Sequence, residues 1–586
     1  MKKNDGDKIA WPNYVGLGLL AVCYAGALLN VCAIRRAETD HEVIRLVHWQ
    51  LELGVRDGVD DLIRRFEEYQ AAKGRKVRVV QIPMPEQSYV QYVTTQLIGG
   101  TAPDMIQLGK FPDEYLGRYF LPVSEAVQNP NPFLAAEAAA DPDNALLATL
   151  AQRPWMDTFT DGLRTMFYDR FQEYYGVGFS QFTIRMFYNR TLFEEVLGSP
   201  EPPANYRELL EACRRIEEYA AQQNITLHPI ASSRYQMEYF KGQYLSGLTR
   251  DVAIHYDTNL DGNFGGEEKM MAVLSGRSGP TDPRYRAGLE SARRIADYFP
   301  RGFMALERMD SAFAFVQGRA AMITSGSWDA RSFMRQIENQ PPERRFEVGI
   351  FELPQIAPDD PEFGKYFDGP ASEAGTGTGF AFGITRNTKN YDLCVEFLQF
   401  ATTPQNNSLL NDHAAWIPSV TGARMDPVLE VFRPNFIGLW GGMDLRFVAR
   451  GRCETLESQV FWPYISGEVS YDEYAATLME QLPPEMAQDF RRLYESRDEA
   501  LPGLRTTRST FLAATVFGPQ DERITNEQKL LRACSSQAVY ERGKWDMRIM
   551  LKKTREELDK QGHTPFSTQF FNSLDRWYNM NLEESL

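Results

Sequence analysis

The chain has 586 residues, of which 43% are hydrophobic and 12% aromatic, and its formal net charge is −16. This length allows two to four domains, and the apolar content predicts large packed cores instead of disorder. The acidity argues against nucleic acid or anionic lipid as the main partner, because phosphate binding rests on Lys and Arg, but it is compatible with a local basic patch. The six cysteines form no CxxC pair and the six histidines no HExxH motif, so neither a disulfide framework nor a zinc site is expected.

The N-terminus has the pattern of an export segment. Lys2, Lys3 and Lys8 precede an apolar run, Tyr14–Ile34, which two arginines follow. About twenty apolar residues can span a bilayer, so this run is either a signal that is cleaved or an inner-membrane anchor formed by residues 14–34. A buried N-terminal helix is the remaining alternative. Residues 1–36 are therefore predicted to be an export signal or a membrane anchor.

Strand and helix patterns then alternate at short spacing. The predicted elements are a strand at 43–49, a helix at 57–72, a strand at 76–82, a helix at 86–98 and a strand at 104–109. This order indicates βαβ units and a parallel sheet, in which ligands sit beyond the carboxyl ends of the strands. Trp49 follows such an end, so its ring is either a flat surface for a ligand or part of the packing.

The rest of the chain alternates less regularly. Residues 110–175 are predicted to be mostly helical, and 176–189 to be strands that pass into another domain. Helices and loops are expected over 205–320, a strand at 377–385, and a largely helical region from about residue 425.

Several phrases carry a family resemblance because they occur in a fixed order over residues 43–480. They are "RLVHWQ", "QLIGGTAPDMIQLG", "FYNRTLFEEVLGSPEPPANYRELLEACRRI", "AFVQGRAAMITSGSWD", "WIPSV" and "VFWPYISGEVSYDEYAATLMEQL". In this order they resemble the extracellular solute-binding proteins of ABC importers, in the sugar-binding group that includes maltose-binding protein. Residues 490–586 fall outside the pattern.

The resemblance implies an α/β fold, the two-lobe periplasmic-binding-protein fold of type II, maltose-binding-like, with a helical C-terminal extension. The expected division places lobe 1 at 42–176 and 377–410, and lobe 2 at 177–376 and 411–489. Residues 490–586 form the extension.

The resemblance also implies a function. An exported protein in the periplasm or cell envelope would capture a carbohydrate in an interlobe cleft and present it to the membrane permease of an ABC importer. The alternative is a membrane-anchored sensor or scaffold subunit of the same fold that docks a partner through its C-terminal helices. Its candidate dock is the amphipathic stretch 544–562, which otherwise packs on a lobe. An enzyme is not expected, because no GxSxG, P-loop or defensible Ser/His/Asp order is present.

Sugars present apolar C–H faces and hydroxyl groups, so aromatic rings and polar side chains are the expected ligand contacts. The resemblance points to Trp49, Gln50, Glu52, Asp104, Gln181, Phe182, Arg185, Trp328 and Trp416. Several have an alternative role: Asp104 as the cap of a turn, Arg185 in a salt bridge, and the tryptophans in the core.

The loop Asp257–Glu268 fits the calcium pattern D-x-[DN]-x-[DN]-G-x5-E. The expected oxygen ligands of a structural Ca²⁺ are Asp257, Asn259, Asp261, Asn263 and Glu268. The alternative is an acidic surface turn without a metal.

Overall fold

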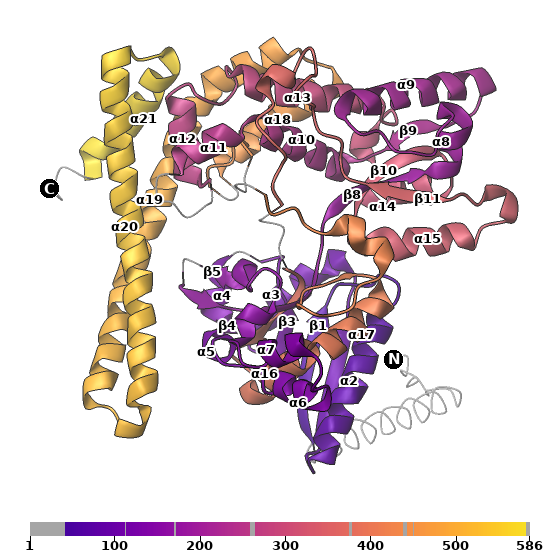
Figure 1. Ribbon diagram of the computed structural model, residues 1–586. Helices are drawn as coiled ribbons and strands as arrows, with labels where there is room; N and C mark the ends of the chain where they lie inside the picture. The colour runs from indigo at the N-terminus through magenta and orange to yellow at the C-terminus, as the bar shows by residue number, and fades with distance from the viewer. Residues whose placement is uncertain are drawn as a thin grey trace, which may run out of the picture.

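The computed structural model describes residues 41–111, 113–168, 171–257, 264–373, 378–437, 442–448 and 451–581. Two β-sheets with their helices form a lower and an upper body, and a long helical hairpin stands beside both (Figure 1). Across these ranges no helix combines the length and the apolar character that crossing a bilayer requires.

The lower body contains a seven-stranded mixed sheet. Its strands are β1 (Glu42–His48), β2 (Val77–Pro83), β3 (Met105–Gln107), β4 (Phe120–Leu121), β7 (Val177–Gln181), β12 (Thr378–Thr385) and β13 (Ile417–Pro418). The order is β13, β7, β12, β3, β1, β2, with β4 also paired to β12. Strand β1 is parallel to both β2 and β3, which confirms the predicted βαβ units. Strand β12 is antiparallel to β3, β7 is antiparallel to β12, and β13 is antiparallel to β7.

Alternating side chains of β1 supply the cores on both faces of this sheet. Ile44 and Leu46 pack with the apolar stripe of α2 (Val55–Ala72), whose Val59, Leu62 and Phe66 are buried. Val47 points to the other face, against α3 (Glu86–Gly99). Period-two alternation in the strand and helical spacing in α2 therefore account for this layered arrangement.

The upper body is built on a four-stranded sheet. Its strands are β8 (Ile184–Asn189), β9 (His228–Ala231), β10 (Ala320–Gly326) and β11 (Val348–Phe351), in the order β11, β8, β10, β9. The helices that matter for the site are α10 (Arg234–Leu248), α13 (Pro283–Ala296), α14 (Arg308–Val316), α15 (Ala330–Glu338) and α18 (Arg452–Ser466).

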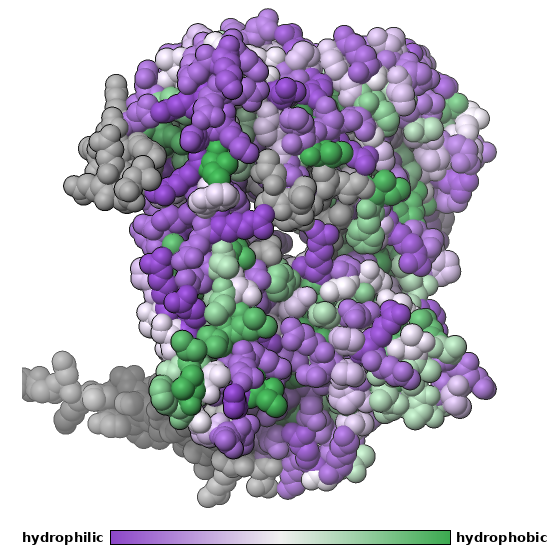
Figure 2. Space-filling view, turned by 60° about the vertical axis from the view of Figure 1, so that its left-hand side comes forward, coloured by the Kyte–Doolittle hydropathy of each residue, from purple (hydrophilic) through white to green (hydrophobic). Residues whose placement is uncertain are grey.

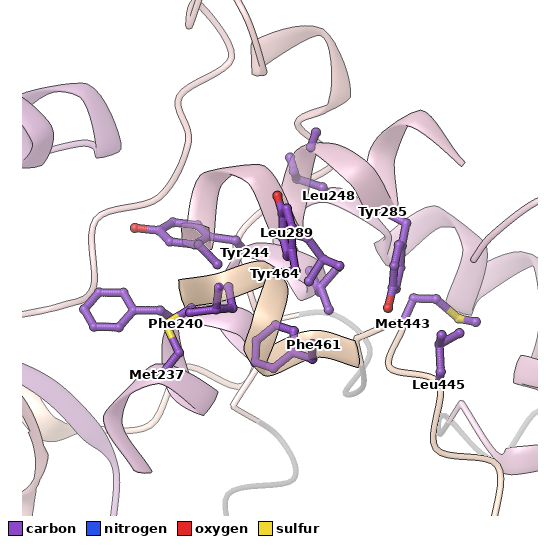
Figure 3. Packing of buried hydrophobic residues seen from close by; sticks show 14 of the residues in the cluster. Met237, Phe240, Tyr244, Leu248, Tyr285, Leu289, Met443, Leu445, Phe461 and Tyr464 are labelled. Carbon is purple, nitrogen blue, oxygen red and sulfur yellow. The ribbon is translucent and has the colours of Figure 1, made fainter. Parts of the chain in front are cut away.

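Helix α10 is held by a large apolar core. Figure 3 shows Met237, Phe240 and Tyr244 of this helix facing Phe461 and Tyr464 of α18, and all five side chains belong to one buried cluster. Leu248, Tyr285, Leu289, Met443 and Leu445 extend the same packing. The core fixes one side of α10 and leaves Glu238 and Tyr239 on the other side.

The chain passes between the two sheets at three places. Residues 182–183 join β7 to β8, residues 352–377 join β11 to β12, and residues after Pro418 return from β13 to the upper body. Phe182 lies in the first of these crossings. Its ring packs edge-on against Trp328 of the upper body and against Trp416 of the lower body, at centroid distances of 5.4 and 4.9 Å.

The C-terminal region consists of α19 (Tyr471–Phe517), α20 (Arg523–Gln561) and α21 (Pro565–Asn581). Met547, Met550 and Leu558 of α20 are buried in the core of the upper body, so the predicted amphipathic stretch 544–562 packs there. The other end of the hairpin runs down beside the lower body (Figure 1). There Arg532 donates a hydrogen bond of 3.3 Å to Gln128 and lies 3.8 Å from the Glu173 carboxylate.

We propose that each sheet forms the centre of one lobe. Strand pairing indicates that the first lobe is longer than the sequence predicted. Strand β7 follows the expected boundary at residue 176, yet it pairs with β12 in the lower sheet. The expected boundary at residue 410 falls inside α17 (Pro404–Ala414), and β13 pairs with β7. The proposed first lobe therefore extends to Gln181 and from Thr378 to Pro418.

The fully buried indole of Trp416 predicts a large loss of stability on truncation. Trp416→Ala should lower the free energy of unfolding by about 3–5 kcal/mol, because it removes buried area and leaves a cavity. Trp545→Ala is the matched control, since that ring is 62% exposed and its loss should change stability by under about 0.5 kcal/mol. Urea unfolding followed by tryptophan fluorescence and circular dichroism measures both, and equal effects of the two substitutions would contradict this packing.

Candidate functional site

Trp49 lies at the carboxyl end of β1, on the side of the lower sheet that faces the upper body. Its backbone N–H donates to the side-chain oxygen of Gln107 at 3.1 Å, and its ring packs edge-on against Tyr89 at 4.8 Å. The ammonium of Lys110 lies 5.5 Å from the indole centroid and pairs with Glu86 at 2.6 Å. The ring is half-buried, so it is held in one orientation and keeps an accessible part.

Glu52 experiences charges from the opposite body. The pKa of Glu52 is raised to about 7, mainly by burial and in smaller part by the negative charge of Asp329, while the positive charge of Arg308 lowers it. Asp329 and Arg308 belong to the upper body, at the end of β10 and at the start of α14. These charges therefore lie near one another where the two bodies approach, and we call the region between them the interlobe space. Figure 2 shows a small opening between the lower and upper parts of the molecule.

The upper wall of this space is polar and aromatic. Arg308 pairs with Asp329 at 2.7 Å, and the Ser325 hydroxyl donates to the same carboxylate at 2.5 Å. Tyr239 donates its hydroxyl proton to Tyr235 at 2.7 Å, and the Arg308 guanidinium lies 6.0 Å from the Tyr235 ring centre. Burial raises the pKa values of both tyrosines, so both hydroxyls stay protonated and able to donate at neutral pH.

Tyr235 and Tyr239 also line a cavity of about 870 Å³. Helix α10, the loop around Asp444 and helix α18 line it, and a buried ion pair of 2.7 Å between Lys241 and Glu457 forms part of its wall. A neighbouring cavity of about 280 Å³ shares Glu238, Tyr239 and Gly242 with it. The open side of α10 therefore borders a volume in the range of small-molecule sites.

Phe182, Trp328 and Trp416 act as packing at the crossing between the lobes. The Phe182 ring lies directly on Gly379, where a Cβ atom would come within 2.2 Å of it, and the Trp328 ring covers Gly326 in the same way. Trp416 is fully buried and offers no face to a ligand, whereas Trp328 is partly exposed. Gln181 is buried beside this cluster, next to a separate cavity of about 260 Å³.

The Arg185 guanidinium donates five hydrogen bonds to other groups of the protein. It donates to both carboxylate oxygens of Glu373, at 2.6 and 3.2 Å, and to three backbone oxygens. Those oxygens belong to Ile184, Val431 and Arg433, at 2.7, 2.7 and 2.9 Å. The guanidinium has only five donors, so the salt-bridge alternative describes Arg185 in this structure and no donor is left for a ligand.

Asp104 lies at the opposite end of the sheet from Trp49. Its carboxylate accepts from the backbone N–H of Arg45 at 2.8 Å and from the Thr388 hydroxyl at 2.6 Å. Because β1 and β3 are parallel, Asp104 is level with Arg45, and Trp49 follows about 13 Å farther along the strand. Asp104 therefore ties the turn after β12 to β1, and the interlobe space lies at the other end.

The predicted calcium loop lies largely outside the described residues, including Asn259, Asp261 and Asn263. Asp257 and Glu268 lie inside them. A carboxylate oxygen of Glu268 accepts the Gly265 N–H at 2.7 Å and so caps α12 (Gly266–Leu274). Among the described residues no group of three or more His, Cys, Asp or Glu side chains is placed to hold a metal ion. Calcium binding by this loop stays a prediction.

Most residues of the upper wall were not predicted from the sequence. Asp329 directly follows Trp328, and Tyr235 and Tyr239 stand four residues apart on one helix face, a spacing that sequence reasoning could have used. Arg308 carries no comparable signal, because its place in the site results from the folding of α14 against β10.

A model of the family described as bacterial extracellular solute-binding protein matches residues 57–408. Among solved structures, the GacH receptor of Streptomyces glaucescens, determined unliganded and with acarbose, is 15% identical. The match covers 75% of this chain and 96% of that one, with a TM-score of 0.50. A protein from Caldanaerobius polysaccharolyticus, described in work on xylan utilization, is 16% identical, with 74% and 98% covered and a TM-score of 0.50. No curated protein matches the sequence. The likenesses establish the type II two-lobe fold, and α19 to α21 lie beyond the matched family region.

The raised pKa of Glu52 predicts a pH-dependent stability. Folding raises the pKa from 4.5 to about 7, so the folded protein keeps a proton that the unfolded chain loses, and stability falls as the pH rises through this window. Glu52→Gln should therefore stabilise the protein at about pH 8, by on the order of 1–2 kcal/mol, and have little effect near pH 4.5. Thermal unfolding over this pH range tests the prediction. Glu338→Gln, at an exposed site, is the control, and a pH-independent difference between Glu52→Gln and wild type would contradict it.

The satisfied guanidinium of Arg185 predicts a second stability effect. Arg185→Met leaves the Glu373 carboxylate and two crossing segments without their common donor, at a cost of about 3–5 kcal/mol. Arg190→Met is the matched control, because the pair of Arg190 with Glu347 is exposed and should contribute under about 1 kcal/mol. Denaturant unfolding compares the two, and similar small losses would show that the Arg185 network is not stabilising.

Proposed function

We propose that this chain, which belongs to the family of bacterial extracellular solute-binding proteins, captures a carbohydrate between its lobes and presents it to the permease of an ABC importer. The observation that carries the proposal is the approach of the two bodies in the interlobe space. There Glu52 of the lower body interacts with Arg308 and Asp329 of the upper body, and Glu86 with Tyr235.

The chemistry of this space suits a neutral polyol. The accessible part of the Trp49 indole and the ring of Tyr235 offer apolar surfaces for the C–H faces of a sugar ring. Glu52, Arg308 and Asp329 offer acceptors and donors for hydroxyl groups. Because Arg308 is paired with Asp329 and Lys110 with Glu86, the walls carry little net charge, which favours an uncharged ligand.

Binding would be coupled to lobe closure. A ligand that contacts both walls gains the second set of contacts only when the lobes approach, so its binding free energy favours the closed form. The family consists of binding proteins, and we accordingly propose reversible capture without a chemical step.

The family places the protein outside the cytoplasmic membrane. Residues 14–34 lie outside the described residues. That they anchor the protein to the inner membrane is a proposal based on the sequence.

The second candidate is a membrane-anchored sensor or scaffold subunit of the same fold. One observation favours it: α20 and α21 follow the matched family region and add a large helical surface. A scaffold would keep its partner with no sugar present, whereas an importer's binding protein should respond to a sugar.

A thermal-shift screen against oligosaccharides and monosaccharides tests the main proposal, because a ligand of the folded state raises the unfolding midpoint by mass action. Trp49→Ala should weaken binding of the best sugar roughly tenfold or more, since the ring is expected to be a central contact. Trp545→Ala, at an exposed ring far from the space, should leave it unchanged. Absence of any shift across a broad panel, or unchanged affinity of Trp49→Ala, would refute the proposal.

A further inference from the structure

The free end of the α19–α20 hairpin carries an exposed apolar surface that we call the hairpin tip. It consists of Leu512, Val516, Phe517, Ile524 and Leu531, whose exposed fractions are 51, 61, 86, 72 and 68%. Isolated exposed apolar residues are ordinary, but five within one short hairpin end indicate a surface that meets something other than water. The tip lies beyond residues 57–408, so the family match does not account for it.

The apolar residues of the tip are not needed to hold the hairpin together. On α20 the buried positions recur every seven residues as Asn526, Ala533 and Tyr540, with Ser536 and Gln537 also buried. Ile524 and Leu531 repeat with the same spacing on a different face and are exposed. Near the tip, small and polar residues therefore form the inside of the hairpin while large apolar residues face outward. This is the reverse of the usual pattern for a hairpin in water.

The charge around the tip also differs from that of the whole protein. Residues 505–532 contain five basic and three acidic residues, a net charge of +2 in a chain of −16. Arg505, Arg523 and Lys529 are exposed. Apolar side chains beside exposed Arg and Lys are the composition that binds the interfacial region of a bilayer, where acyl chains lie next to phosphate headgroups.

The direction of the tip agrees with this composition. Figure 1 shows the hairpin end pointing toward the bottom of the lower body, the end from which the chain enters β1 at Glu42. In Figure 2, with the hairpin side turned forward, hydrophobic residues gather at the lower left. In the sequence, the apolar run 14–34 closely precedes β1. A membrane reached through that run would lie on the side toward which the tip points.

We propose that the hairpin tip docks into the interfacial region of the lipid bilayer next to which the protein resides. A second copy of the chain is a poorer occupant, because five side chains at a helix end bury far less than the roughly 800 Å² per partner of a stable interface. A bilayer requires no matching shape. Because the other end of the hairpin packs in the core of the upper body, a docked tip would hold that body at a defined height above the membrane.

The test uses the full chain in vesicles of phosphatidylethanolamine and phosphatidylglycerol. Cys23, Cys32 and Cys534 are changed to serine, and an environment-sensitive fluorophore is attached at Phe517→Cys. In the vesicles the emission of this fluorophore should shift to the blue, relative to the same protein in buffer or in neutral detergent. Brominated acyl chains should quench the emission. A label at Lys553→Cys, exposed on the upper part of α20, is the matched control and should show neither change.

A second variant measures the apolar contribution. Ile524→Ser together with Leu531→Ser should lower the ratio of docked to undocked tip roughly tenfold or more, because each substitution removes buried apolar area. An unchanged unfolding midpoint and unchanged sugar binding would show that the fold is intact. The proposal is overturned if the label at 517 stays unquenched in lipid. It is also overturned if the blue shift of the emission occurs without quenching by the brominated lipid and depends on protein concentration, because this result would indicate self-association. A shift seen only in membranes that contain the permease would indicate a protein partner and would likewise overturn it.

Discussion

A single guanidinium connects all three segments by which the chain crosses between its lobes. Arg185 stands just after the first crossing, where its guanidinium donates a hydrogen bond to the backbone oxygen of Ile184. Its ion pair with Glu373 holds the second crossing, and its bonds to Val431 and Arg433 hold the third. Glu373 strengthens the arrangement by accepting the backbone N–H of Asn435 at 2.8 Å. Because the guanidinium is almost fully buried and each of its N–H donors is bonded, the three crossings are tied together at one point.

The aromatic cluster beside this point has a complementary role. Phe182 contacts Trp328 above and Trp416 below, so the first crossing is packed against both lobes. The carboxyl end of β1 and the end of β10 then lie close enough for the charge of Asp329 to raise the pKa of Glu52. The site thus depends on the crossings, because they decide which side chains of two separately folded sheets come close. The pair of Arg308 with Asp329 lies near Glu52 because the crossings bring the two bodies together.

The sequence was sufficient to predict the architecture but only part of the site. The alternation in 43–109 predicted β1, α2, β2, α3 and β3, because local periodicity determines such elements. It also placed Trp49 just after the carboxyl end of a strand, where the structure has it. By contrast, Asp104 is a carboxylate at the amino end of a strand, and Arg185 binds partners about 190 and 250 residues away in the chain. Contacts of such long range leave no periodic signal, which is also why Arg308, Tyr235 and Tyr239 were not predicted.

The hairpin adds a constraint that the two-lobe fold alone does not have. It is rooted in the core of the upper body through Met547 and Leu558 and touches the lower body through Arg532. Closure of the lobes must therefore either preserve the contact of Arg532 with Gln128 and Glu173 or break it. Since that contact is a single hydrogen bond and a partly exposed ion pair, it opposes motion only weakly.

Closure of the two lobes around a sugar would shorten a distance measured across the interlobe space. Spin labels at Gln87→Cys and Met309→Cys, in a chain whose Cys23, Cys32 and Cys534 are changed to serine, would flank the interlobe space, because Glu86 and Arg308 next to them already interact across it. Pulsed electron paramagnetic resonance should show a shorter distance when a sugar that raises the unfolding midpoint is added. Binding of such a sugar with an unchanged distance distribution would contradict the account.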